Sequence, residues 1–168
     1  MRVTVTDNQD PSSPGAGLAY TVTVTNLDPA GGAGGGDTAT NVKLEDILVD
    51  KPYSAFPILV NITPTQGSGM GDVTPTQGTC QVGHIVESTP SFPPLLFSRY
   101  YGERAQCDLG DIAPQAFVTV TVNVYPDLNT FVLLQPAGII VNTARATSDT
   151  LDSNPQNNVA AEPTTISR

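Results

Sequence analysis

The sequence predicts an all-β fold, a sandwich of two sheets formed by a single domain, 1–168. Val and Thr alternate with period two in several segments, which is typical of strands that bury one face. The 15 glycines and 15 prolines gather between those segments, where turns are expected. Helical periodicity is missing from the sequence, so a parallel sheet with crossover helices is disfavoured.

The first two expected strands are residues 2–6 and 18–26. Their shared feature is an apolar face opposed by Thr, and that face consists of Val3, Val5, Leu18, Tyr20, Val22 and Val24. The segment between them is rich in Asn, Asp, Pro and Gly, which form turns. We expect these strands to open the sandwich.

A Gly-rich stretch, 28–37, comes next and could be taken for a phosphate-binding loop. Such a loop needs a following helix whose N-terminus meets the phosphate, and a P-loop also needs a Lys. A strand is expected here instead, at 41–49, so 28–37 is interpreted as an inserted loop. Residues 50–57 are a second expected insertion, followed by a short strand at 57–64.

The pentapeptide "TPTQG" occurs twice, at 63–67 and 74–78, and predicts a loop extension, since the duplication is too short for a structural repeat. The segments "TCQVGHIVE" and "AQCDLGDIAP" then border a Pro- and aromatic-rich excursion, 84–104, which is the third expected insertion.

The clearest strand is 117–126, where four valines share a face, and "GIIVNTARATSD" and "NNVAAEPTTIS" complete the series. About seven to nine strands with long inserted loops indicate an immunoglobulin-like Greek-key β-sandwich.

The charge of the chain disfavours two classes of partner, nucleic acids and anionic membranes. The net charge is −9, and the seven basic residues are scattered along the chain, whereas binding to nucleic acid needs clustered Lys and Arg. An anionic membrane surface is disfavoured for the same reason. No apolar run is long enough for membrane insertion.

Cys80 and Cys107 are the only two cysteines, and His84 is the only histidine. A zinc site would lack a fourth ligand, so a disulfide is favoured over free or metal-bound thiols. The loop-entropy relation gives such a bond about 3.5 kcal/mol. A disulfide implies an oxidising compartment.

The cluster Asp149, Asp152 and Asn154 resembles a metal or catalytic site more than any other stretch of the sequence does. These oxygens could ligate calcium, but the spacing is not that of an EF-hand. Asn, Asp and Pro also form tight turns through their own backbone. We favour the turn, with calcium as the alternative and no other cofactor.

The excursion carries a candidate binding loop for a carbohydrate or a host protein. Its aromatic and basic residues could stack a sugar or contact a partner. They are Phe92, Phe97, Arg99, Tyr100, Tyr101 and Arg104. The alternative is that the loop folds back and covers an open sheet edge.

The sequence contains no group of residues typical of an active site, because no nucleophile motif accompanies His84. Lys43 and Asn142 are candidates for a Lys–Asn isopeptide bond, since each lies inside an expected strand. Alternation places Asn142 with Ala144 and Ala146 on a buried face but Lys43 on the solvent side, so a hydrogen-bonded buried Asn142 is favoured.

Six phrases occur in order: "AYTVTVTN", "TATNVKLED", "GTCQV", "CDLGDIAPQAFVTVTVNV", "VNTARATSD" and "DSNPQNN". Together they resemble the bacterial and archaeal surface repeat called domain of unknown function eleven, an immunoglobulin-like module found in tandem. The three insertions depart from its compact pattern.

That resemblance implies a non-enzymatic structural module of an extracellular or cell-surface protein or fibre, acting as a rigid spacer or assembly unit beside neighbouring domains or copies of itself. The alternative function is an adhesin-type binding module for carbohydrate or host protein that uses the 84–104 loop.

Overall fold

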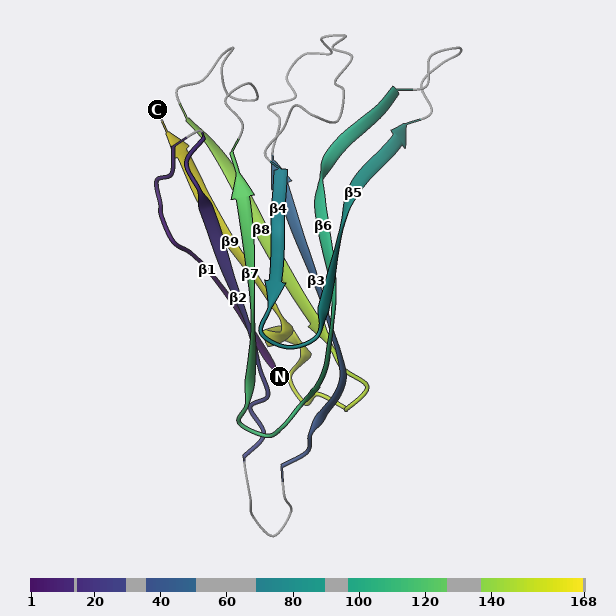
Figure 1. Cartoon of the computed structure of the whole chain (residues 1–168). Coiled ribbons are helices and arrows are strands. Elements are labelled where there is room, and N and C mark those ends of the chain that lie inside the picture. The colour runs from purple at the N-terminus through teal and green to yellow at the C-terminus, as the bar shows by residue number, and fades with distance from the viewer. Residues whose placement is uncertain (14, 30–35, 51–68, 90–96, 127–136, 168) are drawn as a thin grey trace.

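The structure is a computed structural model that describes residues 1–13, 15–29, 36–50, 69–89, 97–126 and 137–167 (Figure 1). These residues form nine strands and one short 3-10 helix. The elements are β1 (Arg2–Asp7), β2 (Leu18–Thr25), β3 (Ala39–Asp50), β4 (Gly69–Pro75), β5 (Thr79–Thr89), β6 (Phe97–Ile112), β7 (Phe117–Tyr125), β8 (Ala137–Thr147), η1 (Pro155–Asn158) and β9 (Val159–Ser167). Within these ranges, no helix is long and apolar enough to cross a bilayer.

The strands form two antiparallel sheets that pack as a sandwich, which confirms the predicted fold class. The four-stranded sheet has the order β1-β2-β7-β4, and the five-stranded sheet has the order β5-β6-β3-β8-β9. On one side of the sandwich β1 lies against β8 and β9, and on the other β4 lies against β5 and β6.

Alternating Val and Thr produce the core as expected. In the register of β2 with β7, Val22 pairs with Val120 and Val24 with Val118, and all four are buried. The neighbouring threonines pair with one another on the opposite face, as Thr21 does with Thr121. Each strand therefore gives one apolar face to the core and one hydroxyl-rich face to solvent.

β4 corrects the sequence prediction, which placed a loop extension there. Its residues 69–75 pair with β7, with an irregular register between Met70 and Val73. Only Met70 and Val73 are apolar in this segment, and Met70 is buried in the core. The alternation was too short and too interrupted by Gly, Asp and Pro to be recognised.

The 84–104 excursion is also corrected, because most of it is not a loop. β5 continues to Thr89 and β6 begins at Phe97, and the two pair along their length with one irregularity after Ile85. In Figure 1 this hairpin extends past the other strands and curves away from them.

The other predicted insertions are only partly described. Residues 30–35 of the 28–37 insertion lie outside the described residues, and so do 51–57 and the expected strand at 57–64.

Candidate functional site

The described part of β5 and the β6 residues beside it form the first site of interest. Cys80 on β5 and Cys107 on β6 are directly opposite each other and joined by a disulfide, with 4.0 Å between their Cα atoms. In an antiparallel pair this short separation is typical of positions whose backbone groups do not bond to each other. The disulfide therefore connects neighbouring strands of one sheet.

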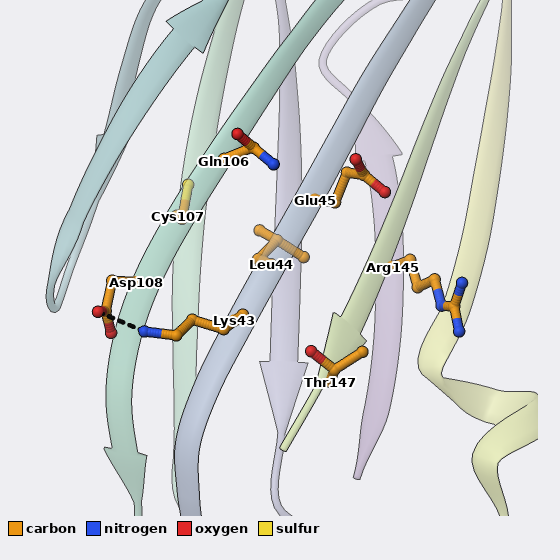
Figure 2. Close-up of a pocket in the computed structure, with 8 residues that line it drawn as sticks. All are labelled: Lys43, Leu44, Glu45, Gln106, Cys107, Asp108, Arg145 and Thr147. Atoms are coloured by element: carbon orange, nitrogen blue, oxygen red, sulfur yellow. Dashed lines mark hydrogen bonds and ion pairs between the residues drawn. The ribbon is translucent and has the colours of Figure 1, made fainter. Parts of the chain in front are cut away.

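A pocket lies on the outer face of the five-stranded sheet, and Figure 2 shows the residues that line it. Its polar lining residues come from β3, β6 and β8, and they are Lys43, Glu45, Gln106, Asp108, Arg145 and Thr147. Lys43 Nζ lies 2.5 Å from Asp108 Oδ2, and this contact holds the pKa of Asp108 below its ordinary value. Both side chains of this pair are about half exposed, so the pair contributes little to stability.

Lys43 thus lies on the outer face of β3, whereas Asn142 is fully buried on the inner face of β8. The structure keeps the two apart, as the alternation predicted. No isopeptide bond between them is compatible with this arrangement.

A buried acid, Asp46, was missed by the sequence reasoning. Asp46 follows Val42 and Leu44 on the inner face of β3 and is fully buried between Ala105 and Ala144 of the flanking strands. The period-two pattern of "NVKLEDILV" could have revealed it, because position 46 shares its face with Leu44 and Leu48.

Burial raises the pKa of Asp46 from 3.8 to about 7, because the charged form loses its water. The nearby amide of Asn142 lowers that pKa in part. Among the described residues, no hydrogen bond of normal geometry reaches the side chain of Asp46 or that of Asn142, so the hydrogen-bonded Asn142 expected from the sequence is not found. The core therefore holds an acid that is largely protonated below neutral pH.

The turn that precedes β9 holds the three candidate calcium ligands. Asp149 Oδ2 accepts a hydrogen bond from Asn41 Nδ2 at 3.0 Å. Asp152 Oδ2 lies 2.6 Å from the amino group of Met1, and Asp152 Oδ1 accepts from the backbone N–H of Asn154 at 2.9 Å. The last contact is an Asx turn.

These contacts give both carboxylates a protein partner. No group of three His, Cys, Asp or Glu side chains that could hold a metal ion occurs among the residues described. Calcium binding by Asp149, Asp152 and Asn154 stays a prediction.

Of the six candidate binding residues, the structure places the side chain of Arg104 alone. It is exposed on β6, with Nη1 3.4 Å from Glu45 Oε1. Phe92 lies outside the described residues. The side chains of Phe97, Arg99, Tyr100 and Tyr101 do so as well, and so does that of His84.

Comparison with known proteins identifies no family and only a distant structural likeness. No protein-family model matches the chain, and no curated protein matches it. Among solved structures, AggA, the major subunit of aggregative adherence fimbriae type I from Escherichia coli, is similar over 98% of this chain and 91% of that chain. The identity is 15% and the TM-score is 0.31. A likeness of this size carries no information on function.

Proposed function

We propose that this chain is a non-enzymatic structural module of an extracellular or cell-surface protein or fibre, in which it acts as a rigid spacer. The observation that carries the proposal is the position of its two ends. Met1 lies beside Asp152, ahead of the start of β9, while Ser12, beyond the end of β1, bonds Thr165 and Ser167 at the end of β9. Residues 1 and 167 therefore lie at opposite ends of the sandwich (Figure 1).

This placement suits a module that separates its neighbours. β1 and β9 run in the same direction, so tension between residues 1 and 167 is directed along both strands. It loads the hydrogen bonds of the β1–β2 and β8–β9 ladders in shear, several at a time, rather than one after another. A nine-residue strand spans about 30 Å, which is the length each module would add.

The disulfide supports the extracellular part of the proposal, because such bonds persist in oxidising compartments. The sequence resemblance to surface repeats found in tandem supports the same role.

The proposal is tested with two copies of this chain joined head to tail by a short linker, measured by small-angle X-ray scattering in dilute solution. The expected maximum dimension is close to twice that of one copy. A matched fusion with a long Gly/Ser linker should give a broad distribution of distances, because such linkers behave as flexible coils. A short-linker fusion that folds back to the dimension of a side-by-side pair would contradict a spacer.

A further inference from the structure

Each sheet of the sandwich has two edge strands: β1 and β4 in one, and β5 and β9 in the other. An edge strand presents unpaired N–H and C=O groups that can bond a strand from another molecule, and proteins usually block such edges. The four edge strands of this sandwich differ in how far these backbone groups are blocked.

The β9 edge is blocked from Pro163 to Ser167. The N–H of Thr165 donates to Asp10 Oδ1 at 3.0 Å, and the C=O of Thr165 accepts from the N–H of Ser12 at 2.9 Å. Ser167 N–H donates to the Ser12 carbonyl at 2.9 Å. Since backbone direction repeats every second residue, Pro163 also faces this edge, where it offers no N–H.

The β4 edge is blocked by other means. The backbone N–H of Met70 donates to the buried carboxylate of Glu103. The irregular register between Met70 and Val73 interrupts the strand, and Pro75 ends it. A bulge, a capping carboxylate and a terminal Pro are recognised ways to stop strand addition.

The β5 edge lacks such devices over residues 79–83, and its register with β6 shifts only later, after Ile85. Because Cys80 and Cys107 are a close pair that do not bond each other's backbone, the N–H and C=O of Cys80 point away from β6, and those of Val82 do so too. Among described residues, none bonds these groups, and open space surrounds the position of a Cβ on Gly83.

Val82 is the apolar part of this edge. It is opposite Ala105 on β6 and shares its core-facing side, yet Val82 is 44% exposed while Ala105 is fully buried. The four-stranded sheet does not cover it. On β1, the remaining edge, Val3 and Val5 are already buried, so pairing there would bury little more.

We propose that the β5 edge is an interface with a second copy of this chain, in which the two β5 strands pair antiparallel about a two-fold axis at Val82. In this register Val82 meets Val82 of the second copy, and Cys80 lies opposite residue 84. About six backbone hydrogen bonds would form. The pairing joins the two five-stranded sheets into one continuous sheet.

Charge makes the β5 edge the place where two copies can approach with the least repulsion. The chain carries a net charge of −9, so most approaches between copies are repulsive. Residues 79–83, "TCQVG", carry no ionisable charge when Cys80 is in its disulfide, and the isologous register places these segments together. The β1 edge, in contrast, carries Arg2 and Asp7.

The disulfide pre-organises this edge. It fixes Cys80 to β6 two residues from Val82, so β5 does not have to be ordered when a partner binds. The interface is nevertheless small, well below roughly 1,200 Å² of a standard one, and the association is therefore weak. It becomes effective where copies are held at high local concentration, and in that respect alone the inference depends on the proposed surface function.

The test is sedimentation velocity of the intact, oxidised protein over a concentration series up to about 1 mM. Wild type should associate reversibly. Val82→Lys places two like charges on the axis and should weaken association at least about tenfold. Val82→Pro should do the same, because the lost N–H points away from β6 and the β5–β6 ladder is preserved.

Val159→Lys is the matched control. Val159 is 47% exposed on β9, at the opposite edge of the same sheet from β5, so this variant adds the same charge away from Val82 and should associate like wild type. Far-UV circular dichroism and melting temperature establish whether each variant folds. If Val82→Pro does not fold, Val82→Lys alone is enough to test the interface. In parallel, the Val82 amide should exchange its hydrogen more slowly as protein concentration rises.

A wild-type protein that stays monomeric to 1 mM would overturn the inference, and so would a Val82→Lys variant that associates as tightly as wild type. Either result leaves the scattering of the dilute head-to-tail fusion unaffected. An extended fusion together with a monomeric wild type would keep the spacer and reject the edge. A compact fusion together with a wild type whose association is weakened by Val82→Lys would reject the spacer and keep the edge.

Discussion

Replacement of Asp46 by Asn is expected to remove a pH dependence from the stability of this protein. The folded-state pKa of Asp46 is about 7, against an ordinary value of 3.8. Between these values the folded protein keeps a proton that the unfolded chain releases. The stability linked to this proton is fully present below about pH 4 and is lost as the pH rises through 7.

The magnitude follows from the shift. At about 1.4 kcal/mol per pKa unit, the difference between the two states amounts to roughly 4 kcal/mol by pH 8. Over the narrower range from pH 5.5 to 8, wild type should lose roughly 2 kcal/mol of unfolding free energy through this group. Asp46→Asn is nearly isosteric and stays neutral, so it should be more stable than wild type at pH 8 and show no loss of this origin.

The assay is urea unfolding with the disulfide intact at pH 5.5, 7 and 8. The quantity of interest is the difference between wild type and Asp46→Asn, because the other ionisable groups are the same in both proteins. Asp72→Asn is the control, since it removes one exposed carboxylate from β4 without touching the core. A difference that does not change with pH, or a wild type that becomes more stable toward pH 8 relative to Asp46→Asn, would refute the reasoning.

Two further predictions concern the disulfide and a buried amide. Reduction of Cys80–Cys107, which are 27 residues apart, should lower the unfolding free energy by about 3.5 kcal/mol in urea titrations with and without reductant; a loss under about 1 kcal/mol would indicate that the hairpin persists in the unfolded chain. Asn26 is buried, and its Nδ2 donates to the carbonyls of Asp37 and Ile112 while its Oδ1 accepts from the N–H of Asp28. Asn26→Ala should therefore cost about 2–4 kcal/mol in the same measurement, whereas a cost within about 0.5 kcal/mol would mean that water replaces the amide.

Strands with one uniform face could be predicted from the sequence. β2 and β7 alternate Val and Thr without interruption, so both their existence and their buried faces follow from periodicity alone. The pairing of Cys80 with Cys107 needed only a count, because the chain has no other cysteine.

Other elements depend on contacts that a local pattern does not contain. β4 exists because β7 offers it a ladder and Met70 reaches the core. The far part of the β5–β6 hairpin joins residues from a segment rich in Pro and aromatic residues, whose composition favours a loop. The exposure of Val82 depends on which strand of the opposite sheet covers it, and this is a property of the assembled sandwich.

The disulfide lies within one sheet, so other interactions must hold the two sheets together. In antibody domains a disulfide links the sheets through the core, but Cys80–Cys107 links adjacent strands of one sheet. Across the sandwich, the hydroxyl of the buried Tyr20 on β2 donates to Thr164 Oγ1 on β9 at 2.7 Å, and Thr164 donates to Asp7 Oδ2 on β1 at 2.6 Å. Burial raises the pKa of Tyr20 to about 12, which keeps this donor protonated at physiological pH. Hydrogen bonds and apolar burial therefore join the sheets, and the covalent bond stabilises the β5 edge, where a single ladder would otherwise hold the strand.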